Sequence, residues 1–252
     1  MTNIILCGCG GRMGKAITAA AVGDYDIVAG VDINASSLAA ACSFPVYESI
    51  FDFPGKADAI IDFSHHSALP SLLQYAKKTY TPLVIATTGH TEEELALMKQ
   101  ASEEIAIFFS GNFSIGINLI INLAKQAART LGADFDIEII EKHHNKKLDA
   151  PSGTALMLAN SIAEEREESE YVYDRHDVRK ARESKEIGIH AVRGGTIVGE
   201  HEVIFAGTNE VVTISHSAAS REIFATGALR ASAYVAKKQI GLYNMTDLIE
   251  GK

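Results

Sequence analysis

The chain has 252 residues, and its 32 Asp and Glu outnumber its 23 Lys and Arg, which gives a formal net charge of −9. So acidic a chain is not expected to bind nucleic acid. Its 47% hydrophobic and 22% charged residues are usual for a globular protein of one large or two small domains. No apolar run reaches the ~18 residues needed to span a membrane, so no membrane partner is expected.

The amino terminus and the cysteines favour a cytoplasmic location. The first residues run directly into a strand pattern without a basic segment, so we expect no signal peptide. Cys7, Cys9 and Cys42 are an odd number without the spacing of metal ligands. We interpret them as reduced thiols rather than as redox or metal-binding residues, and we predict no metal site.

A glycine-rich turn follows the first predicted strand, residues 3–7. Glycines stand at positions 8, 11 and 14, and residues 15–22 have a helical pattern. Such glycines let the backbone approach a pyrophosphate at the helix N-terminus. Met13 stands where the usual third glycine of the motif would be, and a merely structural turn is the alternative. We nevertheless expect a dinucleotide site here.

The second predicted strand, residues 26–31, ends in Asp32. An acid about 20 residues after the turn can accept hydrogen bonds from the adenosine ribose. The next residues, Ile33 and Asn34, are not cationic, so an additional 2′-phosphate has no partner there. We therefore expect NADH to be accepted at least as well as NADPH. Arg12 and Lys15 in the turn are the cations that would act against this preference.

The alternation of strands and helices continues to about residue 113 and predicts a Rossmann-like, doubly wound parallel sheet. Thr91 and Glu94 form the pattern of a capping box at the start of one of these helices. The segments that follow the strands should gather at the carboxyl edge of the sheet, where such folds bind ligands. The predicted elements are strands 57–63, 82–87 and 104–109, and helices 67–78 and 91–103.

The pattern changes in the second half of the chain, where strands follow one another through turns. This change predicts a second, α+β domain with a mixed, mostly antiparallel sheet. We expect residues 1–113 and 220–252 to form a discontinuous dinucleotide-binding domain, and residues 114–219 to form a domain for substrate binding and oligomerisation. The predicted elements are helices 114–131, 152–168 and 220–239, and strands 134–141, 187–192, 200–205 and 211–215.

A cationic cluster between the strand 134–141 and the helix that begins at residue 152 contrasts with the acidic chain. It contains His143, His144, Lys146 and Lys147. Adjacent histidines on a strand point to opposite faces, and no third ligand is spaced to complete a metal site. A packed histidine and solvated lysines are the alternatives. Proton-transfer groups and cations beside the N-terminus of a helix suit a small substrate that bears carboxylates, so we expect an enzyme.

This cluster closely resembles the signature of dihydrodipicolinate reductases, also called 4-hydroxy-tetrahydrodipicolinate reductases, and the resemblance covers essentially the whole chain. It implies an NAD(P)H-dependent oxidoreductase acting on a CH–CH type bond in the diaminopimelate route to lysine. The implied substrate is a cyclic dicarboxylate imine, which is reduced to tetrahydrodipicolinate. The residues that carry the resemblance are Glu138, Glu141, His143, His144, Lys147, Asp149 and 151–155, with 8–14, 86–89, 111–116 and 193–207.

The resemblance also implies a role for each matching residue and a homotetrameric assembly. His143 matches the general acid/base and Lys147 the proton donor. The implied substrate contacts are His144, Ser152, Gly153 and Thr154. The implied cofactor contacts are Gly8, Cys9, Gly10, Gly11, Arg12, Met13, Asp32, Ala86, Thr87, Thr88, Ser110, Gly111, Asn112 and Phe113.

Two departures and two alternatives remain open. Asn145 and Lys146 stand where other members can place Arg or His, which leaves the proton network around Lys147 open. Ile33 replaces a basic residue of some members. The alternatives are another NAD(P)-dependent dehydrogenase on the same two-domain plan and a catalytically silent nucleotide sensor.

Overall fold

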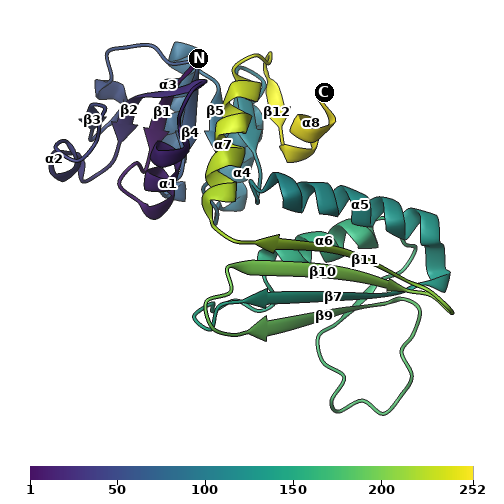
Figure 1. The fold of residues 1–252 in the computed structure, drawn as a ribbon. Coiled ribbons are helices and arrows are strands. Elements are labelled where there is room, and N and C mark those ends of the chain that lie inside the picture. The colour runs from purple at the N-terminus through teal and green to yellow at the C-terminus, as the bar shows by residue number, and fades with distance from the viewer. Residues whose placement is uncertain (252) are drawn as a thin grey trace. The chain divides into compact units, whose positions relative to one another are not determined.

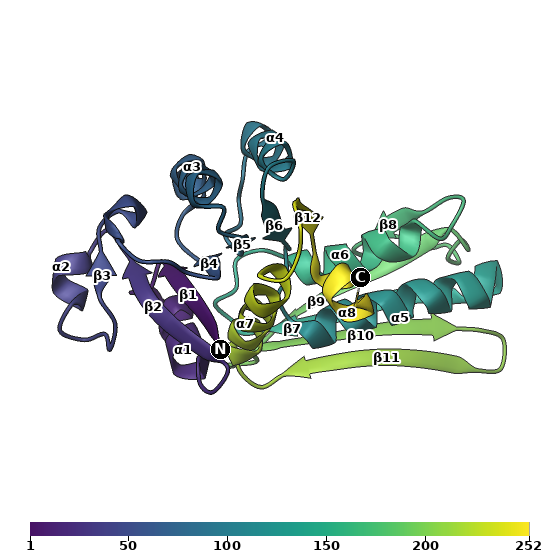
Figure 2. The same cartoon turned by 90° about the horizontal axis from the view of Figure 1, so that it is seen from above.

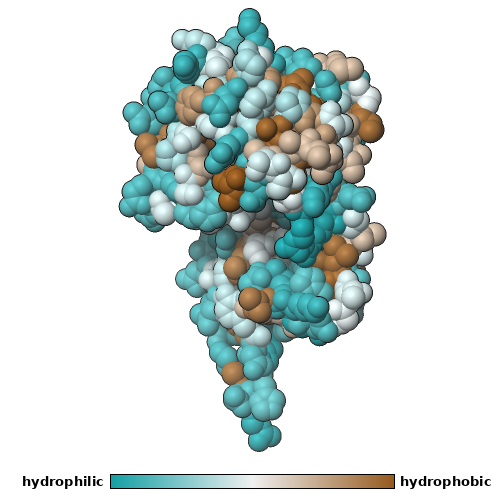
Figure 3. Space-filling model, turned by 90° about the vertical axis from the view of Figure 1, so that its left-hand side faces the viewer, coloured by the Kyte–Doolittle hydropathy of each residue, from teal (hydrophilic) through white to brown (hydrophobic). Residues whose placement is uncertain are grey.

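The structure, a computed structural model, describes residues 1–251. The chain divides into two compact units. Unit 1 comprises Met1–Ile115 and Glu222–Lys252, and unit 2 comprises Gly116–Arg221. Within the described part of the chain, no helix combines the length and the apolar character needed to cross a membrane. On the face shown in Figure 3, apolar residues are scattered among polar ones.

Unit 1 is built on a seven-stranded sheet in which all pairings are parallel. The strand order is β12-β6-β5-β4-β1-β2-β3, so the direction of winding reverses at β1. Ligands in such sheets bind beyond the carboxyl ends of the strands at this reversal. The strands are β1 (Thr2–Cys7), β2 (Tyr25–Val31), β3 (Val46–Tyr47), β4 (Ala59–Asp62), β5 (Leu83–Ile85), β6 (Ala106–Phe109) and β12 (Gly241–Tyr243).

Helices cover both faces of this sheet, with α1 and α7 on one side and α3 and α4 on the other (Figure 2). Strand β1 shows why: Ile4 packs in one cluster with Ile17 of α1, and Ile5 packs in the other with Leu72 of α3. The doubly wound fold is confirmed. The helices of unit 1 are α1 (Arg12–Ala20), α2 (Ala35–Leu38), α3 (Leu69–Thr79), α4 (Glu92–Ala101), α7 (Glu222–Val235) and α8 (Met245–Glu250), with short 3₁₀ turns η1 (Ile50–Asp52) and η2 (His66–Ala68).

Unit 2 has a five-stranded sheet of order β11-β10-β7-β9-β8. Its mixed character is confirmed, although two pairings are parallel and two antiparallel, rather than mostly antiparallel. The helices α5 and α6 lie on one face (Figure 1), where Leu158 of α6 packs with Ile139 and Phe205 of the sheet. The elements are α5 (Ile115–Leu131), η3 (Gly132–Asp134), β7 (Asp136–His143), α6 (Gly153–Ala163), β8 (Glu170–Val172), β9 (Glu186–Arg193), β10 (Gly199–Ala206) and β11 (Val211–Ala218).

Several element boundaries differ from the sequence-based expectation. The helix expected over residues 152–168 ends at Ala163, since the charge run that follows has no apolar face to bury. The helix expected to reach residue 239 ends at Val235. Strand β7 ends at His143, so strand alternation does not extend to His144, which lies after the strand. The short elements α2, β3, β8, β12 and α8 were not predicted.

Candidate active site

The turn between β1 and α1 is tight because two of its glycines leave no room for a side chain. Gly8 has φ +76°, and a Cβ there would lie 2.5 Å from the carbonyl oxygen of Phe63. A Cβ at Gly14 would overlap the carbonyl oxygen of Gly8. Gly14 therefore allows the close approach of helix and turn for which the usual motif uses its third glycine. This explains why Met13 is tolerated at the usual position.

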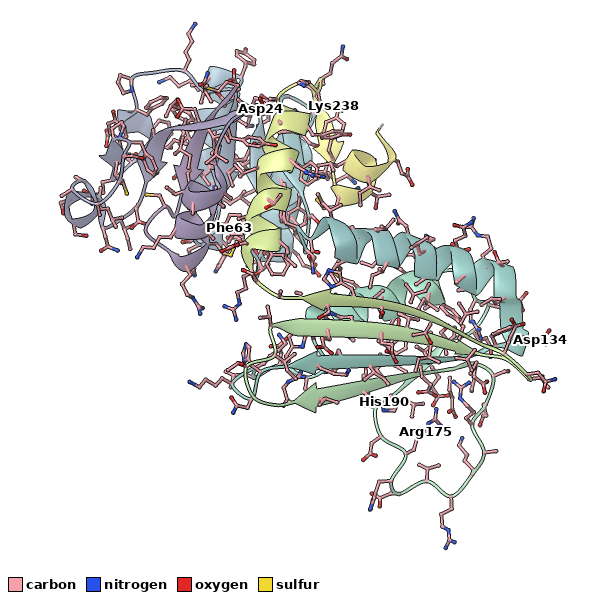
Figure 4. The ribbon with its side chains drawn as sticks, in the orientation of Figure 1. Asp24, Phe63, Asp134, Arg175, His190 and Lys238 are labelled. Atoms are coloured by element: carbon pink, nitrogen blue, oxygen red, sulfur yellow. The ribbon has the colours of Figure 1, made fainter. Side chains whose placement is uncertain are left out.

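A pocket of about 680 Å³ opens beside this turn within unit 1. This volume is ordinary for the site of an organic ligand. Asp32 lines the pocket and is held by backbone N–H groups, with Oδ2 accepting from Gly10 and Oδ1 from Asn34, each at 3.0 Å. Phe63, labelled in Figure 4, follows β4 and lines the pocket as well. A glycine turn that exposes its backbone suits a pyrophosphate, and a carboxylate held in one position suits a ribose. Together, at the carboxyl edge of a parallel sheet, they fit a dinucleotide.

Of the predicted cofactor residues, Gly8, Gly10, Gly11 and Asp32 line this pocket. The remaining ones lie outside its lining but still within unit 1. Cys9 is buried beneath the turn, Arg12 is exposed, and Met13 packs against the core. The loops after β5 and β6 carry the others, namely Ala86, Thr87, Thr88, Ser110, Gly111, Asn112 and Phe113.

These loops are held in place by buried polar groups. The Thr87 hydroxyl donates to Oδ2 of Asp62 at 2.8 Å, and the backbone N–H of Ser64 donates to Oδ1 at 2.9 Å. Burial raises the pKa of Asp62, although these hydrogen bonds oppose the shift. In the β6 loop, Oδ1 of Asn112 accepts from the backbone N–H of Ser114 at 2.8 Å. Thr87 and Asn112 thus shape the carboxyl edge of the sheet.

In unit 2, the predicted acid/base His143 is bound to the carboxylate of Glu141, a residue of the signature to which the sequence assigned no role. Its Nδ1 lies 2.6 Å from Oε2 of Glu141, two residues earlier on β7. The side chain of Glu141 is fully buried, whereas that of His143 is 12% exposed. His143 therefore remains accessible while its partner is shielded from water. The sequence did contain one indication of this buried carboxylate. Glu141 lies on the same face of β7 as the apolar Ile137 and Ile139, where an acid is unexpected.

Glu141 has two further partners. Arg193 of β9 donates to both carboxylate oxygens, from Nη1 to Oε2 at 2.8 Å and from Nη2 to Oε1 at 2.6 Å. The backbone N–H of Ser152 donates to Oε1 at 3.0 Å. Burial would raise the pKa of Glu141, but the hydrogen bonds from Arg193 and His143 outweigh it and lower that pKa below its ordinary value. Glu141 is thus a buried carboxylate kept ionised.

The predicted proton donor Lys147 lies in the turn after β7. Its Nζ forms an ion pair with Asp149 at 2.8 Å, and its side chain is 21% exposed. The hydrogen bond from Lys147 lowers the pKa of Asp149. Arg193 also donates from Nη2 to the backbone carbonyl of Asp149 at 2.7 Å. The turn that carries Lys147 is therefore tied to the same guanidinium that binds Glu141.

The start of α6 presents the predicted carboxylate-binding residues. Ser152 is the N-cap, and its Oγ accepts from the backbone N–H of Ala155 at 3.2 Å. Gly153 and Thr154 form the first turn of the helix, where backbone N–H groups and the helix dipole favour an anion. A Cβ at Gly153 would meet nothing within 4 Å, so its surroundings are open. The first turn of α6 can therefore accept a ligand.

Two further residues near this cluster were missed from the sequence. His201 of β10 is buried, its Nε2 lies 3.0 Å from Oγ of Ser152, and its ring meets that of His143 edge-on at 5.2 Å. Burial, and then the neighbouring His143, lowers the pKa of His201 to about 4. Arg221 donates from Nη2 to Nε2 of His144 at 3.3 Å. His201 lies within the segment 193–207 that carries the resemblance, which implied no role for it, and Arg221 lies outside the segments that carry the resemblance.

The described residues contain no group of three or more His, Cys, Asp or Glu side chains arranged to hold a metal ion.

Comparison with known protein families gives a match over nearly the whole chain. The family model described as "Dihydrodipicolinate reductase, N-terminus" matches residues 2–113. The model described as "Dihydrodipicolinate reductase, C-terminus" matches residues 116–249. The two matches together include the glycine turn of unit 1 and the histidine and lysine cluster of unit 2.

Curated relatives agree with these models. A 4-hydroxy-tetrahydrodipicolinate reductase from Caldanaerobacter subterraneus is 53% identical over 253 residues, with 99% of each chain covered. A protein of the same name from Clostridium tetani is 50% identical, with 97% of this chain and 96% of the relative covered. Identity this high over 96–99% of both chains extends the match from single motifs to nearly the whole chain.

Solved structures support the same relationship. The dipicolinate-bound dihydrodipicolinate reductase from Paenisporosarcina sp. TG-14 has a TM-score of 0.80 and 27% identity, with 97% of each chain covered. A probable dehydrogenase from Thermotoga maritima has a TM-score of 0.64 and 10% identity, and the match covers 98% of this chain and 92% of that one. At this identity the likeness shows the fold alone. With both family models matched in chain order and relatives identical at half of all positions, the chain belongs to the dihydrodipicolinate reductase family.

Proposed function

We propose that this protein reduces 4-hydroxy-tetrahydrodipicolinate, a cyclic dicarboxylate, to tetrahydrodipicolinate with a reduced nicotinamide dinucleotide, in the diaminopimelate route to lysine. The observation that carries the proposal is the cluster of unit 2, in which His143 and Lys147 adjoin a helix start suited to a carboxylate. The names of relatives about half identical to this chain support the substrate. The dinucleotide, when bound, supplies the hydride.

In this proposal, His143 is the general acid/base and Lys147 the proton donor. Both side chains are partly exposed, at 12% and 21%, so both can reach a ligand. Loss of water from the substrate requires a proton for the departing hydroxyl, and hydride addition builds negative charge on the ring system. The imidazole of His143, held by Glu141, can exchange the proton, and the ammonium of Lys147 can stabilise the negative charge. The ion pair with Asp149 keeps Lys147 in one place until a ligand competes for it.

We propose that the carboxylates of the substrate bind at the start of α6 and beside His144. The first turn of α6 offers Gly153 and Thr154, and Ser152 provides a hydroxyl. Arg221, in contact with His144, adds a guanidinium suited to bidentate carboxylate recognition. Two separated anion sites match a ligand with two carboxylates.

We further propose that residues 1–113 and 220–252 bind the dinucleotide, and that NADH is accepted at least as well as NADPH. Among the described residues that line the pocket of unit 1 there is neither Lys nor Arg, whereas Asp32 and Glu48 are both present. A 2′-phosphate beside two carboxylates would be repelled. The side chain of Ile33, a residue that is 85% exposed, has no group that could donate a hydrogen bond to this phosphate.

We propose that residues 114–219 bind the substrate and form the contacts of a homotetramer, and that the enzyme works in the cytoplasm. Light scattering coupled to size-exclusion chromatography tests the assembly, because a mass of one chain, 27.1 kDa, would contradict it.

The activity is tested by the loss of NADH absorbance when the unstable substrate is generated from pyruvate and aspartate semialdehyde. We expect turnover with NADH, at a kcat/KM no lower than with NADPH. Dinucleotide binding without turnover would favour a nucleotide sensor and contradict the proposal. A strong preference for NADPH would leave the reaction standing but refute the proposed cofactor choice.

A further inference from the structure

The buried carboxylate of Glu141 has all of its acceptor positions filled. Oε2 faces Nδ1 of His143 at 2.6 Å and Nη1 of Arg193 at 2.8 Å, while Oε1 faces Nη2 of Arg193 at 2.6 Å and the backbone N–H of Ser152 at 3.0 Å. A carboxylate offers about four lone-pair positions. Glu141 thus joins the reactive imidazole, a guanidinium and the start of α6.

This arrangement determines which nitrogen of His143 carries the proton. The guanidinium of Arg193 and the N–H of Ser152 can only donate, so Glu141 is the acceptor in these three contacts, and the hydrogen bonds from Arg193 and His143 lower its pKa and keep it ionised. Nδ1 of His143 then has to be a donor as well, since two acceptors cannot share a 2.6 Å contact. In the neutral ring, Nε2 is left as the basic nitrogen.

The surroundings of Nε2 are shaped to leave it accessible. Gly199 of β10 lies next to it, and a Cβ there would sit only 3.1 Å from Nε2. The ring of His201 on β10, which burial keeps neutral, meets the His143 ring edge-on at 5.2 Å, and the guanidinium of Arg193 shares Oε2 of Glu141 with His143. Among the residues that the structure describes, Glu141 alone is hydrogen-bonded to Nδ1 of His143, and it thereby sets the orientation of the ring.

We propose that Glu141, clamped by Arg193, is a positioning residue that fixes His143 in the Nδ1–H form and so makes Nε2 the atom that exchanges protons with the substrate. This inference rests on the proposed function for its role in turnover, although the tautomer itself can be observed without turnover. The same carboxylate holds the start of α6 through Ser152. The proton-transfer group and the carboxylate-binding helix therefore keep a fixed separation.

The tautomer is tested first on the unaltered protein. We expect ¹⁵N solid-state NMR of the histidine-labelled full chain, with the His143 signals assigned by their loss in His143→Ala and recorded at a pH at which they are those of a neutral ring, to show the proton on Nδ1. A neutral ring protonated at Nε2 overturns the proposal. This measurement requires neither activity nor a folded Glu141 variant. Failure of the proposed function in the coupled assay would therefore be seen separately.

The role in turnover is tested with Glu141→Gln, alone and combined with His143→Ala. We expect the single Glu141→Gln change to lower kcat by about 10²-fold or more, as befits a group acting through an acid/base. In the His143→Ala background the same change should leave kcat unchanged, although KM can rise because the start of α6 loses its contact. An equal kcat loss in both backgrounds indicates a merely structural role and overturns the proposal, as does an unchanged kcat in the single variant.

Two further variants test whether the negative charge of Glu141 is what matters and provide a matched control. Glu141→Asp keeps the carboxylate and should recover part of the kcat lost in Glu141→Gln. The matched control is Glu138→Gln on the same strand, whose carboxylate also pairs with a histidine and an arginine, at 2.8 Å to His190 and 3.5 Å to Arg175. His190 and Arg175 lie on the side of the sheet away from α5 and α6 (Figure 4), so kcat should stay within about twofold of the wild type.

Discussion

Replacing His201 with Gln should make the stability of the protein less sensitive to acid. His201 is 5% exposed, and burial followed by the proximity of His143 lowers its pKa from 6.5 to about 4, while Glu141 opposes the shift and His216 and Lys147 add to it. Between these two pKa values the unfolded chain binds the proton and the folded chain does not. The stability contributed by the neutral ring is therefore lost as the pH falls from about 6.5 towards 4.

The magnitude follows from the two pKa values. At pH 5 an unfolded ring of pKa 6.5 is almost fully protonated and a folded ring of pKa about 4 is mostly neutral, which corresponds to a loss of about 2 kcal/mol relative to pH 7. Gln cannot titrate, and its side-chain amide retains a donor for the hydroxyl of Ser152. Carboxylates that titrate over the same range contribute equally to both proteins.

The assay is urea unfolding of the wild type and of His201→Gln at pH 7 and pH 5, at one protein concentration. We expect the wild type to lose about 2 kcal/mol more than the variant between the two pH values. The control is His176→Gln, in which an imidazole with a side chain 84% exposed is replaced and the wild-type response should be retained. If wild type and His201→Gln lose stability equally, the neutral buried imidazole is not the cause and the reasoning fails.

Four other substitutions test the proposed residues of unit 2 and of unit 1. His143→Ala and Lys147→Ala should each lower kcat by about 10²–10⁴-fold with a smaller effect on KM, and an unchanged kcat would remove that residue from the mechanism. Gly14→Ala should weaken NADH binding and lower the melting temperature, because its Cβ overlaps the carbonyl of Gly8; equal affinity in a fluorescence titration would contradict this. Glu48→Gln should raise kcat/KM for NADPH relative to NADH, since it removes one of the two carboxylates of the pocket, and an unaltered ratio would place Glu48 too far from the 2′-position to matter.

The parts of the fold that sequence reasoning found are those with strong local signals. The apolar run of β1, the glycine turn and the capping box of Thr91 with Glu94 each depend on neighbouring residues, and all three are present. The short elements β3 and β12 could not be found in this way. Each has only two or three residues and is defined by pairing with another strand, β3 with β2 and β12 with β6, which is distant in the sequence. Their register depends on tertiary structure rather than on periodicity.

In the candidate site, too, the residues close together in the sequence could be predicted, and those brought in from other strands could not. His143, Lys147 and the start of α6 lie in one stretch of about a dozen residues, so a motif could identify them. Arg193, His201 and Arg221 reach the same cluster only because sheet pairing and the chain after β11 bring them there. An acid on the apolar face of β7 was a visible anomaly, but its partner could not be named without the pairing of β7 with β9.

The carboxylate of Glu141, whose acceptor positions are all occupied, limits which residues of the enzyme can be changed. Because the side chains of Glu141 and Arg193 satisfy each other, a change to one leaves the other without its partner, so these two positions are expected to vary together among homologues or not at all, whereas any residue but proline at position 152 keeps the backbone N–H. Gly153, with open space where a side chain would begin, belongs to no such pair. A side chain introduced at Gly153 would project into the space proposed for a substrate carboxylate and would change which acids bind, whereas Glu141 and Arg193 are best transferred together into any new scaffold.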